Sequence, residues 1–515
     1  MPEEFIKHFA ADIYSSDIRH QGYILTIIAN HHHGLDISAI QEHLLLSRRT
    51  IYKYIESINE VAQIAEENET DENIHYGEIK KEKNLYYFTG NQINFHYLFC
   101  KIIDQSIAII LSKQFLVNHE ISVKQFCYDN YISETALRRN IAKFNNYMKK
   151  YGVSILISKG SLTLNGDSVK IRFGLANFLW RNYRGLQWPF ANISKKSMRN
   201  LALRIGTIYA LDFNEGKLNE LMYIFGTNLS QIHVNNFINP AEINQNLLDL
   251  LILDDRDQEL YDYLNYNFEL TDFELNFVIL WFKTMSDAYS SSNRAQIIFG
   301  KLKALNHPFY KKIVKYIMAV ESRTNTKIDF NTPNGELFLA TVIAGQFHLN
   351  LFHDLNFTVS NIDMDQFGNN MEAGLFHGIR ELTIPNNYEL TEAELNTSIM
   401  FNAVAFILIF PSHYFDPKIN ILVKMDATSF AEQLFTTRIN EILAPNFNVE
   451  IFTQKTMGYV IKPDVLVSTA LFVDNKIDPE HQIFIKPQLD YNDRLYLREF
   501  MTRITKEKAP KIFDV

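Results

Sequence analysis

The spacing of apolar residues repeats between two segments in the first third of the chain. Residues 47–59 and 133–145 align at an offset of 86, and each opens with a serine that is followed by apolar residues at helical spacing. Apolar residues recurring every three or four positions predict an amphipathic helix, and the leading serine is a typical N-cap. The matched apolar positions are Ile51 with Leu137, Ile55 with Ile141, and Ile58 with Phe144.

A short apolar helix is predicted ahead of each segment, over Ile37–Leu44 and residues 123–130, followed by a tight turn. A short helix, a turn and a longer helix form a helix-turn-helix motif. Residues 80–89 and 153–164 then read as β-hairpins, the second with Lys159 at its tip. A hairpin after the second helix is a wing, so we predict two winged helix-turn-helix domains.

The two predicted recognition helices place basic and aromatic side chains on their exposed faces, where such groups suit phosphates and base edges of DNA. Residues 1–168 hold 17 basic and 20 acidic residues, which argues against a broad basic field, but residues 133–152 hold five basic residues and one acidic residue. We therefore predict DNA binding, with a protein-interaction scaffold as the alternative. The expected contact residues are Arg48, Arg49, Tyr52, Lys53, Arg138, Arg139, Asn140 and Lys143 on the helices, with Lys81 and Lys159 on the wings.

A second repeat, at an offset of 120, lies in the middle of the chain. Residues 270–276 and 390–396 share five of seven residues, and each reads as a Thr-x-x-Glu capping box at the start of an apolar helix. The pattern predicts two copies of an all-helical domain. The same offset pairs His233 with His353, and a histidine at one place in both copies is either structural or a titratable functional residue.

The C-terminal segment changes to short β-rich runs, which predict a small parallel α/β domain. The loop at residues 424–429 stands at a predicted helix N-terminus, where a phosphate could bind, but it contains no glycine and no cysteine. The predicted strands are 420–423, 448–452, 464–467 and 482–485, and the predicted helices are Ser429–Leu443 and 492–505.

Composition and motifs exclude several classes of protein. With 47% hydrophobic residues, 19 glycines and 13 prolines in 515 residues, the chain is neither disordered nor collagen-like. It has no GxxxxGK[ST], GxGxxG, HExxH or GxSxG motif, so no enzyme is expected. Two cysteines and the consecutive histidines at 31–33 lack the spacing of a metal site, and no cofactor is expected. The acidic segment 1–4 predicts no export signal, and the densest apolar run, only eight residues at 403–410, predicts no membrane span. Two cysteines cannot form a disulfide framework, which predicts a reducing, cytoplasmic location.

The order of these parts resembles the Mga and AtxA group of virulence transcription regulators of Gram-positive bacteria. In that group, two winged helix-turn-helix domains precede two helical phosphotransferase-system regulation domains (PRDs) and an α/β tail similar to the IIB component of sugar permeases (EIIB-like). The resemblance rests on the repeated segments that begin at Ser47 and Ser133 and on the domain order. It implies a mainly α-helical, multidomain chain with boundaries at 1–92, 93–168, 169–291, 292–412 and 413–515.

The resemblance further implies a DNA-binding regulator that links carbohydrate status to gene expression. Its PRD histidines would be phosphorylated by the phosphocarrier proteins HPr and EI, and it would act on promoter DNA as a homodimer. The tail lacks the cysteine that carries phosphate in many IIB components, which points to a role in dimerisation or sensing. An RNA-binding antiterminator with paired PRDs and a phosphotransfer relay remain as alternatives. The candidate phosphorylation sites are His233, His353, His377 and His413.

Overall fold

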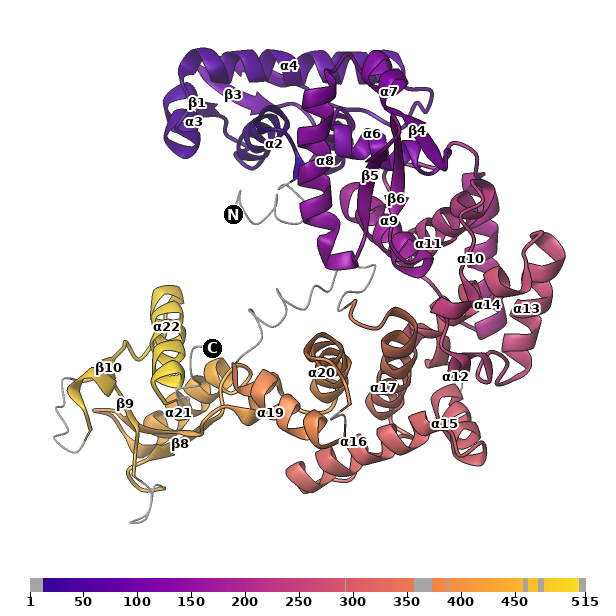
Figure 1. Cartoon of the computed structure of the whole chain (residues 1–515). Coiled ribbons are helices and arrows are strands. Elements are labelled where there is room, and N and C mark those ends of the chain that lie inside the picture. The colour runs from indigo at the N-terminus through magenta and orange to yellow at the C-terminus, as the bar shows by residue number, and fades with distance from the viewer. Residues whose placement is uncertain are drawn as a thin grey trace. The chain divides into compact units, whose positions relative to one another are not determined.

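The computed structural model describes residues 13–291, 293–355, 373–386, 389–456, 462–470 and 477–508. The acidic segment 1–4, on which the expectation about export rested, lies outside these ranges. The chain divides into two compact units, Met1–Ser291 with Phe347–Ile362, and Ser292–Gln346 with Asp363–Val515. In the described residues the chain is mainly helical, with two small antiparallel sheets and one parallel sheet (Figure 1).

Two modules of similar construction open the first unit, and we call them the first and second winged modules. The first contains α2 (Ser16–Ala29), β1 (Leu35–Asp36), α3 (Ile37–Leu44), α4 (Arg48–Glu67), β2 (Ile79–Glu82) and β3 (Leu85–Phe88). The second contains α5 (Gln92–Ile103), α6 (Ile107–Gln114), β4 (Glu120–Ser122), α7 (Val123–Asp129), α8 (Glu134–Met148), β5 (Ser154–Ser158) and β6 (Ser161–Asn165).

The predicted helices and hairpins of both modules are confirmed at their positions. The sheets have matching antiparallel orders, β1-β3-β2 and β4-β6-β5. Strands β1 and β4, which were not predicted, precede α3 and α7 and pair with the second strand of each wing. All six repeated apolar positions of α4 and α8 are at most 7% exposed, so these faces form the module cores.

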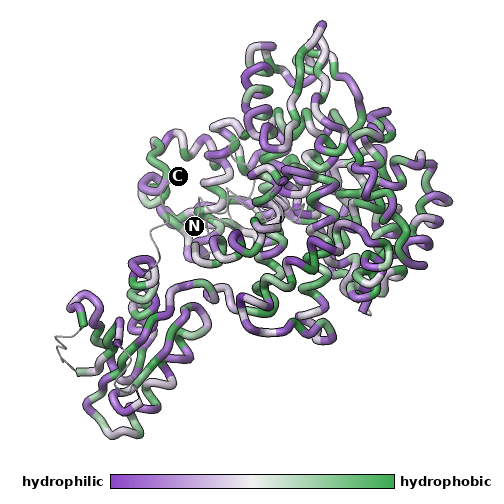
Figure 2. Tube along the Cα trace, turned by 60° about the horizontal axis from the view of Figure 1, so that its bottom comes forward, coloured by the Kyte–Doolittle hydropathy of each residue, from purple (hydrophilic) through white to green (hydrophobic). Residues whose placement is uncertain are grey.

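Helices fill the rest of the first unit and open the second. They are α9 (Ser168–Tyr183), α10 (Lys195–Tyr209), α11 (Glu215–His233), α12 (Gln245–Leu248), α13 (Asp255–Asn267) and α14 (Asp272–Lys283), then α15 (Arg294–Ala304), α16 (Pro308–Thr324), α17 (Pro333–Phe352), α19 (Ala373–Thr383) and α20 (Glu392–Ile407). The offset of 120 carries the start of α14 onto the start of α20, as the repeat predicts. Along the described trace, hydrophobic and hydrophilic residues follow one another at short intervals (Figure 2).

The two predicted capping boxes differ in outcome. Thr391 and Glu394 form a complete capping box at the start of α20. Thr271 caps α14, but the predicted second half of its box is wrong, because Glu274 is buried and pairs with Arg172 of α9 at 2.5 Å. Glu274 also accepts a hydrogen bond from the Ile238 amide at 2.7 Å. Leaving a buried carboxylate without a charged partner costs more free energy than leaving a helix start without its second cap, so Glu274 pairs with Arg172.

The C-terminal part of the second unit is a parallel sheet with two helices, as predicted. The strands β7 (Ile419–Lys424), β8 (Val449–Thr453), β9 (Val465–Ser468) and β10 (Gln482–Phe484) lie in the order β10-β9-β7-β8. Helices α21 (Ser429–Leu443) and α22 (Tyr491–Lys508) pack on one face of this sheet and share its main core (Figure 1).

Within the described residues, no single helix has both the length and the apolar character needed to cross a bilayer. In the part of the chain that the structure describes, α5 and α6 taken together reach that length and hydropathy, but they are bent by 81° relative to each other.

Candidate nucleic-acid interface

Serine caps fix where the two recognition helices begin. Ser47 Oγ accepts a hydrogen bond from the Thr50 amide at 3.2 Å, and Ser133 Oγ accepts one from the Ala136 amide at 3.1 Å. These bonds satisfy N–H groups that the first turn of a helix leaves without partners. The predicted N-caps of α4 and α8 are therefore confirmed.

The turn before each recognition helix contains one residue with left-handed backbone. Leu45 has a φ of 54° and Tyr131 a φ of 52°, and the two are 86 residues apart, as the repeat requires. Their side chains are 92% and 97% exposed. A non-glycine residue rarely adopts this conformation, so its recurrence shows that both turns follow one backbone path.

An asparagine on each recognition helix binds the first strand of the wing. In the second module, Asn145 donates through Nδ2 to the Ile155 carbonyl at 3.0 Å and accepts from the Ile155 amide at 2.7 Å. In the first module, Asn59 makes the same pair of bonds to Ile79, at 2.9 and 2.8 Å. Since β2 and β5 are edge strands, each asparagine satisfies backbone groups that the sheet leaves unpaired. We call this contact the asparagine clamp.

The predicted contacts on α4 gather in its first two turns. Arg48 is partly engaged within the module, because its guanidinium donates to Gln41 Oε1 and Ser38 Oγ on α3, both at 3.0 Å. Arg49 and Lys53 are exposed. The N-terminal turns of a recognition helix are the part that meets base edges in helix-turn-helix complexes, so this placement fits DNA contact.

The predicted contact residues on α8 differ in how accessible their side chains are to DNA. Arg138 is exposed and pairs with Glu134 one turn earlier at 2.6 Å. Arg139 is exposed, and its side chain makes no hydrogen bond or ion pair with any residue that the structure describes. Asn140 is half-buried and donates to a carbonyl of its own helix at 2.8 Å, and Lys143 is also half-buried. Arg139 is therefore the side chain of this helix that is most available to a phosphate or a guanine.

The wings place lysines at or near their tips. Lys159 occupies the turn of the second hairpin with a φ of 49°, as predicted. Lys81 lies along β2 with its ammonium group 5.4 Å from the centre of the Tyr86 ring, not at the tip. The tip of the first hairpin is Lys83 and Asn84, both with positive φ. Sequence reasoning missed Lys83, although Lys-Asn between two strands is a turn signal.

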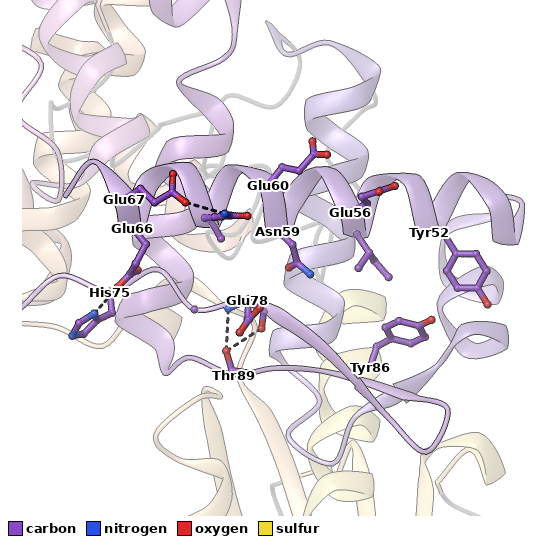
Figure 3. A pocket seen from close by; sticks show the side chains of 14 residues that line it. Tyr52, Glu56, Asn59, Glu60, Glu66, Glu67, His75, Glu78, Tyr86 and Thr89 are labelled. Atoms are coloured by element: carbon purple, nitrogen blue, oxygen red, sulfur yellow. Dashed lines mark hydrogen bonds and ion pairs between the residues drawn. The ribbon is translucent and has the colours of Figure 1, made fainter.

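A cavity of about 1040 Å³ lies between α4 and the first wing (Figure 3). Tyr52 and Tyr86 stand at one end with ring centres 6.3 Å apart, and His75 with its partner Glu66 stands at the other. The hydrogen bond from His75 keeps the pKa of the Glu66 carboxyl below its usual range. Five carboxylates line the cavity: Glu56, Glu60, Glu66, Glu67 and Glu78.

The two modules therefore present different charges beside their recognition helices. Carboxylates repel phosphates, so the wing side of α4 is unfavourable to DNA beyond its first two turns. The segment from Ser133 to Gly152, which contains α8, carries Glu134 as its one acidic residue, and that carboxylate is paired with Arg138. The second winged module has the more favourable surface for DNA.

The four candidate phosphorylation sites divide by exposure. His233 ends α11 and His353 follows α17, and both are exposed at equivalent helix ends. His377 on α19 is exposed and lies 3.1 Å from the Glu381 carboxylate. His413 lies in a 3₁₀ turn (Ser412–Phe415) and is 8% exposed, and burial lowers the pKa of its imidazole. Among the described residues, Nδ1 of His413 has no hydrogen-bond partner.

His348 is a titratable residue that sequence reasoning missed. It lies in α17, is 2% exposed and makes a 2.9 Å hydrogen bond through Nε2 to the Leu355 carbonyl. Its ring packs against Phe173 and Phe352. Burial lowers the pKa of this imidazole to about 4, so the residue is neutral and structural.

The loop that precedes α21 uses its polar groups internally. Lys455 Nζ donates to Ser429 Oγ at 2.6 Å, and Thr469 Oγ1 donates to Asp426 Oδ1 at 3.2 Å. The Asp426 carboxylate would repel a phosphate at this helix start, and no described residue here is a nucleophilic thiol. The loop therefore lacks the groups of a phosphate-carrying site.

Comparison with known proteins agrees with the geometry of the second winged module. Residues 91–179 match the Mga helix-turn-helix domain. A relative described as a putative trans-acting regulator, from Streptococcus pneumoniae serotype 4 (strain ATCC BAA-334 / TIGR4), is 25% identical over 137 residues. That alignment covers 26% of this chain and 28% of the relative, so it spans little more than a quarter of either protein. The resemblance is thus confirmed for this part, and the chain contains a helix-turn-helix domain of the Mga family.

Proposed function

We propose that this chain is a DNA-binding transcription regulator. The observation that carries the proposal is the exposed, unengaged Arg139 on the recognition helix of a module that matches the Mga helix-turn-helix domain. An arginine in this position can bind phosphate or the O6 and N7 atoms of guanine. The wing tip at Lys159 supplies a second cation for the DNA backbone.

The second winged module supplies most of the DNA affinity in this proposal. The first module carries the acidic cavity beside its recognition helix, and Arg48 at the start of that helix is bonded to α3. That cavity favours a second candidate role for the first module, contact with a basic segment of another protein. An interaction scaffold without DNA affinity is accordingly the function to test against.

The test is titration of the full chain with promoter fragments at several salt concentrations. Replacing Arg138 and Arg139 by alanine should weaken binding and reduce the slope of log K against log salt by about one for each lost phosphate contact. The control is Arg204→Ala, which removes a partly exposed arginine of α10 that is paired with Glu259. Equal slopes for wild type, variant and control would remove the second winged module from DNA binding.

We further propose that the two helical repeats are PRDs whose histidines are phosphorylated by HPr and EI. The repeated helix order and the exposure of His233, His353 and His377 support this, since a phosphoryl donor must reach the imidazole. On His377 a phosphoryl group would repel the neighbouring Glu381 carboxylate and break their contact, which would alter the surface of α19.

Phosphate transfer from labelled phosphoenolpyruvate, with purified EI and HPr, tests this part. Single alanine variants of the three exposed histidines should each reduce labelling or one of them should abolish it. His413→Ala should leave labelling unchanged because that ring is 8% exposed. Full labelling of a chain that lacks all three exposed histidines would contradict the assignment.

We also propose a homodimer formed through the C-terminal EIIB-like domain. Phe430 on α21 is 80% exposed and Tyr496 on α22 is 54% exposed, and aromatic groups of this kind are enriched at interfaces. Light scattering should give a dimer mass for the wild type and a monomer mass for Phe430→Glu. A dimer mass for both proteins would exclude Phe430 from the interface.

A further inference from the structure

A further cavity lies in the C-terminal domain, between α21 and α22. Its volume is about 610 Å³, within the range of small-molecule pockets. Its lining comes from both helices and from the residue Leu489 before α22. Helix α21 contributes Arg438, Glu441 and Ile442, and α22 contributes Tyr491, Arg494, Leu495 and Arg498. The two helices lie side by side on one face of the parallel sheet (Figure 1).

Three arginines surround this cavity without a carboxylate partner. Arg438, Arg494 and Arg498 make no ion pair with any residue in the described part of the chain, and only Glu441 brings negative charge to the lining. Arg494 is oriented by a 3.0 Å hydrogen bond from its Nε to the Leu489 carbonyl, which leaves its terminal nitrogens available. By contrast, Arg503 on the same helix pairs with Glu507 at 3.2 Å.

The remaining lining is apolar or aromatic. Leu489 is 2% exposed and forms part of the floor, Ile442 is half-buried, and Leu495 is 47% exposed. Tyr491 is 79% exposed, so its ring is free to cover a bound group. Ligand pockets commonly combine such an apolar lining with a few charged groups that fix the orientation of the ligand.

We propose that this cavity binds a small organic phosphate, with the phosphoryl group held by the arginines and the organic part packed against Tyr491, Leu489 and Leu495. Guanidinium groups bind phosphate oxygens in a bidentate manner, and three like charges around one cavity repel one another until an anion neutralises them. A doubly charged phosphoryl group supplies that neutralisation better than a single carboxylate does.

The cavity is separate from the loop at residues 424–429. Arg438 lies nine residues beyond Ser429 along α21, which is about 14 Å at the rise of an α-helix. The loop has its own internal partners in Lys455 and Thr469. A ligand in the cavity would therefore bind without involving the loop, and its binding is independent of whether the chain binds DNA.

Calorimetric titration of the full chain with phenyl phosphate tests the proposal, with phenol and inorganic phosphate as partial probes. Phenyl phosphate should bind with one site per chain, inorganic phosphate more weakly, and phenol without measurable heat. The double variant Arg438→Gln, Arg498→Gln should lose at least about tenfold in affinity, since hydrogen bonds to charged groups contribute at least that much. Both arginines are exposed, so circular dichroism should show the variant folded.

The matched control is Arg503→Gln, which removes an arginine of α22 outside the cavity and should leave the affinity unchanged. The proposal is overturned if no saturable binding is seen up to about 10 mM phenyl phosphate, because a dissociation constant above that concentration would be weaker than the millimolar affinities of simple ligands. Equal affinity in the double variant and the control would also overturn it. So would binding of an oligoglutamate peptide alone, because the arginines would then serve a protein contact.

Discussion

Loss of the asparagine clamp should loosen the second wing by a predictable amount. In Asn145→Ala, the Ile155 amide and carbonyl both lose their partners, at 2.7 and 3.0 Å. A net hydrogen bond contributes about 1 kcal/mol, and an unsatisfied buried backbone group costs about 1 to 3 kcal/mol. Asn145 is half-buried, so water replaces part of the loss, and we expect the wing to open more easily by about 2 kcal/mol.

The assay is hydrogen exchange of peptides that cover β5, measured on the full chain. A change of about 2 kcal/mol should speed exchange of the Ile155 amide by about 30-fold, since 1.4 kcal/mol corresponds to a factor of ten. Local exchange reports the opening of the wing itself, whereas an unfolding curve of the chain reports several domains together.

The control for this variant is Asn146→Ala on the same helix. Asn146 is exposed and its side chain makes no hydrogen bond with any residue that the structure describes, yet its replacement brings the same gain in helix propensity. The control should leave exchange at Ile155 unchanged. If the two variants give equal exchange at Ile155, the clamp does not hold the wing.

Further predictions concern the helical repeats. Glu274→Gln should destabilise the chain by about 3 to 5 kcal/mol, because it removes the charged partner of the buried Arg172. Glu394→Gln should cost about 1 kcal/mol or less, because it weakens only a helix cap. The melting temperature of Glu274→Gln should therefore be lower than that of Glu394→Gln. The folded state holds His348 neutral with a pKa of about 4, so stability is complete above about pH 6.5 and falls as the pH drops towards 4. Unfolding at pH 7.5 and pH 5, followed by tryptophan fluorescence, should show about 2 kcal/mol less acid destabilisation in His348→Gln than in the wild type. An identical pH dependence of the two proteins would contradict the buried, neutral state of His348.

Local signals in the sequence were sufficient to predict the two helix-turn-helix segments, both wings and the two helices of the C-terminal domain. The serines at 47 and 133 start α4 and α8, and the predicted bounds Ile37–Leu44 and Ser429–Leu443 agree with α3 and α21. These elements could be predicted because caps and apolar periodicity act within a few residues of each other. The parallel sheet of the C-terminal domain could be predicted because strands that alternate with a helix are typical of parallel pairing.

Features that depend on distant partners were not predicted. Glu274 and Glu394 stand in the same motif, but Arg172, which lies 102 residues earlier in the chain, takes the carboxylate of Glu274. Strands β1 and β4 have two and three residues and exist through pairing with the wings. The acidic cavity and the engagement of Arg48 likewise arise only when α3, α4 and the first wing meet. Tertiary contacts of this kind leave no periodic trace in the sequence.

The most direct test of the central claim is selection of promoter fragments from a library by the full chain at two salt concentrations, with and without prior incubation with HPr, EI and phosphoenolpyruvate. A DNA-binding regulator should enrich particular fragments, hold them less well at high salt and show a changed enrichment after phosphorylation. Absence of enrichment under every condition would contradict DNA binding and favour an interaction scaffold.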